Sequence, residues 1–196
     1  MPRSGSDTRA AIIAAAEELF YSGSLREVSL DRIAERAGVS KKTIYYHFRS
    51  KDELIAAYLD ARNLPTLERY RRWAGREGPM AERVQRLFHR LAKAVATPGW
   101  RGCGFIRAAV ELADLPGHPA LEVARAHKRG FETWLRTELE TEGYPDAGDL
   151  AATLMLLIDG ASIRMLVQRD PGYAGVAAQL AGQLLAKRPE DGSQGT

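Results

Sequence analysis

The sequence predicts an all-α fold of about nine helices, and three observations carry that prediction. Apolar residues recur at helical spacing along most of the 196 residues. No segment shows the alternation of a β-strand, and no internal repeat is present. Residues 29–53 carry helix caps and a turn glycine in the order typical of two short helices followed by a third. The chain is therefore predicted to begin with a three-helix helix-turn-helix module and to continue into a larger helical module.

The helix-turn-helix segment is defined by its caps. Ser29 can cap the first short helix, and Gly38 ends that helix with the left-handed backbone that glycine tolerates. Ser40 can cap the next helix. Ser50 can cap the one after it, and Glu53, three residues on, completes a capping box. These signals predict a short helix at 41–47, immediately after a tight turn.

The helix at 41–47 carries the chemistry of this module. If Ile44 and Phe48 face the core, a rotation of about 100° per residue turns the polar side chains outward. The outward residues are Lys42, Thr43, Tyr45 and Tyr46. Seven helical residues measure about 10 Å, which fits a major groove about 12 Å wide. Because no acid lies between positions 41 and 51, this surface suits a polyanion. A solvated basic face over core aromatics is the alternative, and it leaves the agreement of caps, turn and charge unexplained.

The other predicted helices follow from apolar periodicity and from glycine and proline breaks. Residues 1–6 are predicted to be a mobile polar arm, and Pro65 is predicted to bend or break the fourth helix near Leu64. The remaining helices are predicted at 7–21, 51–73, 80–95, 105–112, 120–142, 149–167 and 172–187. The predicted domains are a helix-turn-helix domain at 1–52, a helical domain at 53–188 and a disordered tail at 189–196.

Charge and composition narrow the class of protein. Residues 1–51 hold nine Lys/Arg and six Asp/Glu, whereas the rest of the chain holds nineteen of each. The basic excess is therefore confined to the N-terminal quarter, as expected for a nucleic-acid-binding module joined to a neutral one. A single cysteine excludes an internal disulfide and fits a reducing compartment.

The N-terminus lacks the apolar core of a secretion signal, and no uninterrupted apolar run reaches the roughly 18 residues that span a bilayer. The longest run, 150–158, is interrupted by Asp159. The sequence therefore predicts a cytoplasmic protein with no membrane partner.

Residues 40–54, SKKTIYYHFRSKDEL, preceded by SLDRIAERAGV, resemble the DNA-binding signature of TetR-family transcriptional regulators. The resemblance covers about the first 60 residues, and a weaker one is seen in RGCGFIRAAVELADLPGHPAL. It implies that the helix at 41–47 is the recognition helix of a protein that binds a double-stranded DNA operator. The implied DNA-binding residues are Ser29, Ser40, Lys41, Lys42, Thr43, Tyr45, Tyr46, His47 and Lys51.

The same resemblance implies a ligand-binding and dimerisation domain. The last two helices would form a four-helix interface in a homodimer, although packing within one chain fits their pattern equally well. A small-molecule effector, apolar or aromatic, would bind between the helices and release a repressor from a pseudo-palindromic operator. Candidate pocket residues are Trp100, Phe105, Phe131, Trp134, Met155 and Ile158, each of which also fits plain core packing.

An enzyme is the main alternative class, and the sequence offers it little support. The histidines at 47, 89, 118 and 127 lack metal-ligand spacing, and no cofactor motif is present. Cys103 with His127 could serve as nucleophile and base only if the two met in the fold. A role for Cys103 in sensing oxidants or electrophiles is a secondary hypothesis. Asp159 could contact a polar ligand, cap the dimer interface or pair with Arg164. A module that binds an acidic protein through residues 41–51 is a third class.

Overall fold

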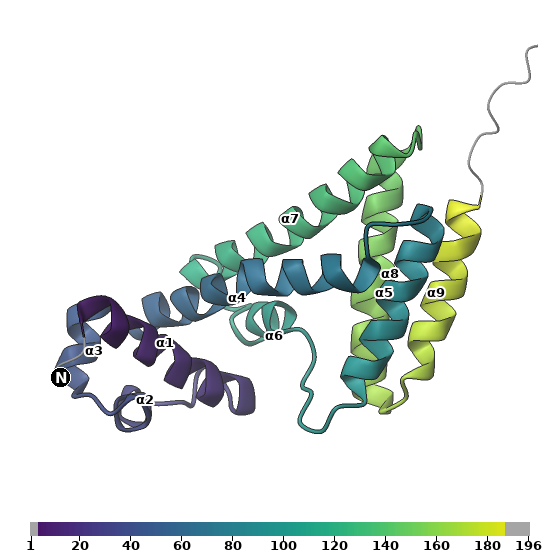
Figure 1. The fold of residues 1–196 in the computed structure, drawn as a ribbon. Helices are drawn as coiled ribbons and strands as arrows, with labels where there is room; N and C mark the ends of the chain where they lie inside the picture. The colour runs from purple at the N-terminus through teal and green to yellow at the C-terminus, as the bar shows by residue number, and fades with distance from the viewer. Residues whose placement is uncertain (1–3, 187–196) are drawn as a thin grey trace, which may run out of the picture. The chain divides into compact units, whose positions relative to one another are not determined.

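The computed structural model describes residues 4–186; the predicted tail at 189–196 lies outside the described residues. This part of the chain holds helices and no strands, which confirms the all-α prediction (Figure 1). The helices are α1 (Gly5–Ser22), α2 (Leu30–Ala37), α3 (Lys41–His47), α4 (Lys51–Ala74), α5 (Met80–Val95), α6 (Gly104–Glu111), α7 (Pro119–Thr141), α8 (Ala147–Gln168) and α9 (Gly172–Leu185).

The chain packs into two compact units. Among the described residues, the first comprises residues 4–66 and Cys103–His127, and the second comprises Leu67–Gly102 and residues 128–186. Each has its own hydrophobic core. The first half of α4 belongs to the first unit because Leu54 and Leu59, both fully buried, pack in the same core as the helix-turn-helix. The boundaries of the compact units therefore differ from the predicted domain boundary at residue 52. A functional boundary at that residue stays a prediction.

The first unit is built as its caps predict. The Ser29 and Ser40 hydroxyls accept hydrogen bonds from the backbone N–H groups of Arg32 and Thr43. Gly38 ends α2 at φ 67°, the left-handed conformation in which a side chain would be strained. At the start of α4, Ser50 accepts from the Glu53 N–H at 3.1 Å, but the Glu53 carboxylate accepts from the Arg49 N–H at 2.7 Å. That carboxylate thus reaches one residue beyond the predicted capping box.

Two predictions about helix ends and breaks are wrong. Gly5 and Ser6 are helical rather than part of an arm, because Ser4 caps α1 through a reciprocal capping box with Asp7. Helix α4 continues past Pro65, so the predicted break is wrong, whereas the predicted bend stays a prediction. A proline removes one helical hydrogen bond. Buried Thr66 and Leu67 hold the helix on the C-terminal side of that position.

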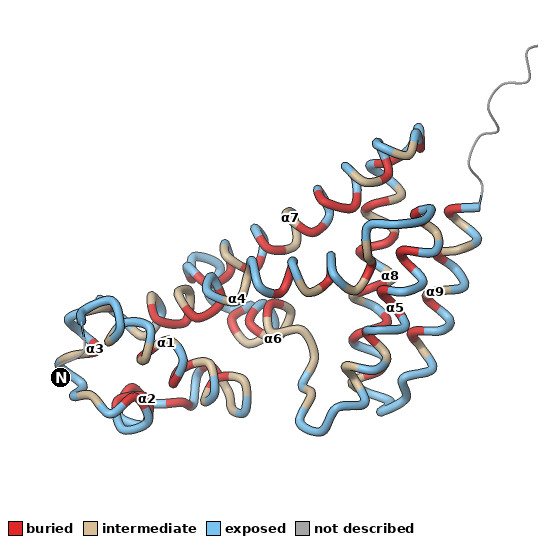
Figure 2. The backbone as a smooth tube through the Cα atoms, in the orientation of Figure 1, coloured by how far each residue is buried: buried red, intermediate tan, exposed pale blue. Residues whose placement is uncertain are grey.

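The second unit is organised around α5, which packs against α8 and α9. The three helices lie side by side, and buried and exposed residues alternate along α5 (Figures 1 and 2). Fully buried Leu87 and Phe88 lie in this core with Leu154 and Met165 of α8 and Ala181 of α9. The small residues of α9 allow this close approach.

Helix α8 departs from one prediction, which concerns the partner of Asp159. By length and composition alone it is apolar enough to cross a membrane, as are the core helices of many soluble proteins. Its Asp159 pairs with Lys128 at 2.5 Å, whereas Arg164 donates to the Tyr173 hydroxyl at 2.9 Å. The suggested Asp159–Arg164 pair is therefore absent, and the aspartate is tied to α7 instead.

Candidate nucleic-acid interface

Helix α3 is fixed to the first unit by one apolar edge. The side chains of Ile44 and Phe48 are each only 1% exposed and lie in the same core as Ile12, Phe20 and Ile33. The guanidinium carbon of Arg9 lies 5.0 Å from the centre of the Phe48 ring and covers it from α1. Because its inner edge is packed and its N-terminus is capped, the outer face of α3 is presented by a rigid support.

The outer face carries the residues that helical rotation predicts. Tyr46 is 83% exposed and Tyr45 is 52% exposed, so two aromatic hydroxyls face solvent. Lys41 and Lys42 are exposed, while Thr43 and His47 are half-buried. The Tyr46 and His47 rings meet edge to face with centroids 5.1 Å apart. A major groove of DNA would thus meet hydroxyl, aromatic and cationic groups along one short helix.

The two lysines of α3 differ in their neighbours. Lys41 donates to the Asp31 carboxylate of α2 at 2.9 Å, and this hydrogen bond, reinforced by the opposite charge, raises the pKa of Lys41. Within residues 4–186, the Lys42 side chain makes no hydrogen bond or ion pair. Asp31 partly neutralises the basic face, whereas Lys42 keeps its full charge for a partner. The sequence window 41–51 could not reveal this acid, which belongs to the preceding helix.

The remaining predicted DNA-binding residues have structural partners. Ser29 and Ser40 cap their helices, and Ser40 also shares a 2.8 Å hydrogen bond with the Thr43 hydroxyl. Lys51 donates to the backbone carbonyl of Arg26 at 2.6 Å, and burial lowers its pKa. Lys51 thus fixes the segment between α1 and α2, and its role toward DNA stays a prediction.

A polar network that the sequence did not reveal joins α6 to the segment between α1 and α2. The Glu111 carboxylate accepts from the Leu25 N–H at 2.7 Å and from the Ser24 hydroxyl at 2.9 Å. Arg107 donates to the carbonyls of Tyr21 and Gly23 at 2.9 Å each. These partners lie more than 80 residues apart in the chain, so no local pattern could have predicted them.

Replacing Glu111 with alanine should lower the free energy of unfolding by about 1–2 kcal/mol, because the part-buried Leu25 N–H would lose its acceptor. Thermal unfolding and amide exchange at Leu25 would measure the effect. Asp114→Ala is the control, since it removes only an exposed ion pair with Arg26, which solvent screens and which therefore adds little to stability. Equal destabilisation by the two variants would contradict a special role for Glu111.

The six predicted pocket residues are divided between the two units. Phe131 and Trp134 stack with centroids 5.4 Å apart and share one core with Met155 and Ile158. Phe105 belongs to the core of the first unit, where it stacks on His127 at 3.7 Å. Trp100 is half-buried and belongs to neither core. Trp134 also lines a groove of about 960 Å³ beside Arg71 and Glu138, and its indole N–H donates to Glu138 at 3.0 Å.

The groups considered for catalysis are not assembled into a site. His127 shares a 2.8 Å hydrogen bond with Asn63, and Cys103 is half-buried at the start of α6. In the described part of the chain, no group of three His, Cys, Asp or Glu residues is placed to hold a metal ion. The possible redox role of Cys103 stays a prediction.

Comparison with known proteins agrees with this geometry. The family model for bacterial regulatory proteins of the tetR family matches residues 12–58. The HTH-type transcriptional regulator TtgR of Pseudomonas putida is 49% identical over 55 residues, which make up 28% of this chain and 26% of TtgR. The chain thus matches only about a quarter of that relative's length.

Longer matches extend the similarity to the second unit. The regulator EthR of Mycolicibacterium smegmatis is 25% identical over 87% of this chain and 80% of its own. A crystal structure of a TetR-type transcriptional regulator from Streptomyces avermitilis superposes with a TM-score of 0.82, at 31% identity over 92% of this chain and 97% of that one. These relatives are transcriptional regulators and not enzymes, which sets the enzyme alternative aside. With the helix-turn-helix and the C-terminal unit both matched, the chain belongs to the TetR family of bacterial transcriptional regulators.

Proposed function

We propose that this protein is a cytoplasmic repressor that binds a pseudo-palindromic DNA operator as a homodimer and is released by a small-molecule effector. The observation that carries the proposal is the outer face of α3, where Lys42, Tyr45 and Tyr46 are exposed on a helix fixed by buried Ile44 and Phe48. Cations position a protein on phosphates, while polar and aromatic groups read base edges in the major groove.

A pair of variants tests which lysine neutralises phosphate. Lys42→Ala should reduce the salt dependence of DNA binding by about one unit of slope, because it removes one phosphate contact. The double variant Asp31→Asn with Lys41→Met removes an ion pair of zero net charge and should leave the slope nearly unchanged. The measurement is fluorescence anisotropy of a labelled duplex across salt concentrations. If Lys42→Ala and the wild type show the same salt dependence of DNA binding, Lys42 does not contact a phosphate.

Sequence specificity is tested by selecting bound duplexes from a random DNA pool at two salt concentrations. One inverted-repeat motif is expected, because a two-fold dimer presents two copies of α3 to successive major grooves. Tyr45→Ala and Tyr46→Ala should relax the motif and cost about 1–3 kcal/mol on the selected site. If duplexes are enriched without a common motif and the enrichment is lost at higher salt, the basic face binds phosphate without sequence specificity. If the protein binds an acidic protein but no DNA, residues 41–51 would instead form a protein-interaction module.

Dimerisation is supported by exposed apolar residues on the last two helices. On α8 the side chains of Leu156, Ile163 and Val167 are 74%, 46% and 67% exposed and follow one another at seven- and four-residue intervals. On α9, Val176 and Leu180 are 57% and 45% exposed. Residues at those intervals share one helix face, and a contiguous apolar face of this kind is typical of an interface.

The effector is proposed to contact the apolar core around Phe131 and Trp134, which favours an apolar or aromatic molecule. Such a ligand releases DNA only if it prefers the conformation that binds DNA less tightly. A coupling free energy of about 1–3 kcal/mol would change operator affinity roughly 5- to 150-fold. Once the operator is known, a screen for compounds that weaken operator binding tests this part of the proposal. Failure of every apolar and aromatic compound would contradict it.

A further inference from the structure

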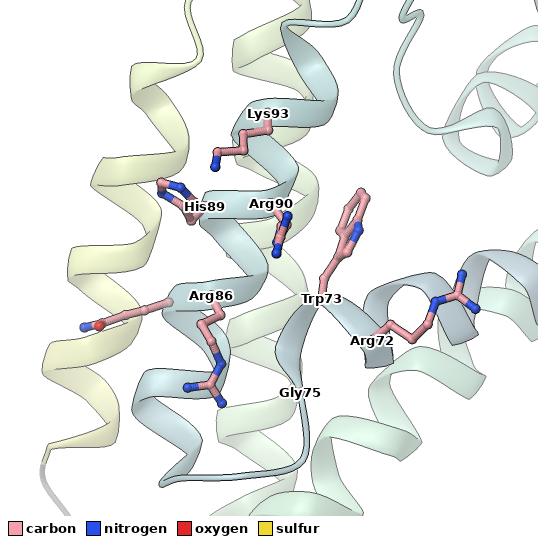
Figure 3. A pocket seen from close by; sticks show the side chains of 8 residues that line it. Arg72, Trp73, Gly75, Arg86, His89, Arg90 and Lys93 are labelled. Carbon is pink, nitrogen blue, oxygen red and sulfur yellow. The ribbon is translucent and has the colours of Figure 1, made fainter.

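A basic groove lies in the second unit, between the end of α4 and the outer face of α5 (Figure 3). Its volume is about 570 Å³, within the range of roughly 300–1,000 Å³ that is usual for small-molecule sites. The residues that line it are Arg72, Trp73, Gly75, Gln85, Arg86, His89, Arg90 and Lys93. No carboxylate is among them. This surface is called the α5 basic groove below.

The pattern of α5 explains why these side chains face solvent together. Positions 85, 86, 89, 90 and 93 fall within about 140° of one another at 100° per residue. The opposite side of the helix is buried through Met80, Val84, Leu87, Phe88 and Leu91. Helix α5 is thus packed on one side, and its backbone places the groove residues together on the exposed side.

The charges of the groove are poorly neutralised by the protein itself. Arg86 is anchored, since its Nε donates to the Ala74 carbonyl at 2.9 Å, but its nearest carboxylate oxygen, on Glu82, lies 3.7 Å away. Within residues 4–186, the side chains of His89, Arg90 and Lys93 make no hydrogen bond or ion pair. Arg86 and Arg90 lie four residues apart on one helix, where like charges destabilise each other. A bound anion would relieve this repulsion.

Trp73 adds a flat apolar wall to the groove. Its ring is half-buried and meets the Tyr70 ring edge to face at 5.2 Å, and Arg69 lies 5.4 Å from its centre. Figure 3 shows the Trp73 ring beside the Arg90 side chain, while Arg72 extends away from the α5 residues. A planar ligand could stack on an aromatic ring held in this way, with its negative charge directed to the cations of α5.

We propose that the α5 basic groove binds a small anion that carries a planar ring, either a nucleotide or an aromatic carboxylate. The groove shares no residue with the six predicted effector contacts or with α3, so this would be a second ligand site. The charge demands an anion, the volume limits its size, and Trp73 favours a flat ring over an inorganic ion.

The test is isothermal titration of the full chain with adenosine monophosphate, salicylate and inorganic phosphate. At least one ring-bearing anion should bind with a dissociation constant in the micromolar to low millimolar range, and more tightly than phosphate. The double variant Arg90→Glu with Lys93→Glu should weaken that binding by about tenfold or more, because it reverses two charges that face the ligand. Both side chains are exposed, and neither makes a hydrogen bond or ion pair within residues 4–186. Higher salt should weaken the wild-type affinity as well.

The matched control is Arg136→Glu, a charge reversal on the exposed face of α7 that breaks only an exposed pair with Glu140. It should leave the affinity nearly unchanged. Trp73→Leu should bring the ring-bearing anion close to the affinity of phosphate, provided that thermal unfolding shows a folded variant. The comparison of affinities for adenosine monophosphate and for salicylate shows whether the groove prefers nucleotides or aromatic carboxylates.

Several outcomes would overturn the proposal. These are no binding of either ring-bearing probe at millimolar concentration, binding no tighter than that of phosphate, and equal weakening by the Arg136 control. The proposal also fails if the double variant loses affinity for duplex DNA and not for the small anions, since the groove would then be a nucleic-acid surface.

Discussion

Leu156→Glu is expected to convert the protein into a monomer and to weaken operator binding by about a hundredfold or more. Leu156 is 74% exposed on α8, so a glutamate there leaves the fold of one chain intact. In a symmetric dimer the substitution places two carboxylates in one apolar interface, and burying an unpaired charge is costly. The loss at the operator follows because linked half-site contacts gain roughly 10²–10⁴ in affinity over single ones.

Sedimentation velocity gives the oligomeric state, and anisotropy with the selected operator gives the affinity. Val110→Glu is the matched control, because Val110 is 72% exposed on α6 and belongs to the other unit. That variant should stay dimeric and keep its operator affinity. A dimeric Leu156→Glu protein with unchanged operator affinity would rule out the exposed α8 face as the dimer interface.

The features predicted correctly from the sequence depend on neighbours along the chain. Caps and turns involve residues within about four positions, so Ser29, Gly38 and Ser40 placed α2 and α3 to within a residue. The burial of Ile44 and the exposure of Tyr46 followed from helical rotation once the helix was located. The outward face of α3 was therefore predictable before its structure was known.

The features that the sequence missed involve partners far apart in the chain. The Asp31–Lys41 pair crosses a helix boundary, and the Glu111–Leu25 hydrogen bond spans 86 residues. Phe105 is a large aromatic residue and was therefore a pocket candidate. It packs in the core of the first unit, because α6 and the helix-turn-helix share that core. Periodicity tells which face of a helix is apolar, but not which element covers it.

The structure also separates two kinds of cation that composition counts together. Lys41 and Arg86 are each held by partners of their own chain, Asp31 in one case and the Ala74 carbonyl in the other. Lys42 and Arg90 are exposed without such partners among residues 4–186. Net charge is therefore a poor guide to a binding surface. The cations that lack internal partners point to where an anion is needed, on α3 for DNA and on α5 for a small ligand.

Arg83→Ala is expected to lower the free energy of unfolding by about 3 kcal/mol, the lower end of the range for breaking a buried ion pair. Arg83 is only 6% exposed, and its guanidinium lies 2.7 Å from the Glu138 carboxylate and 3.7 Å from that of Glu142. Its Nε also donates to the Gly75 carbonyl at 3.1 Å. Truncation would leave two neighbouring carboxylates without their cation, and those carboxylates keep partial exposure of 31% and 24%.

Chemical denaturation measures this loss, provided that the denaturant m-values of the variant and the wild type agree. Arg136→Ala is the control, since it breaks only an exposed ion pair with Glu140 on the same helix as Glu138. Charge imbalance rather than lost packing is the expected cause. Arg83→Met combined with Glu138→Gln and Glu142→Gln should therefore recover part of the stability, because removing a whole ion cluster costs less than removing one member. If the triple variant is less stable than Arg83→Ala, the negative charge that strengthens the hydrogen bonds from Trp134 and the Met80 N–H matters more than the charge imbalance, because glutamine accepts those bonds only as a neutral group.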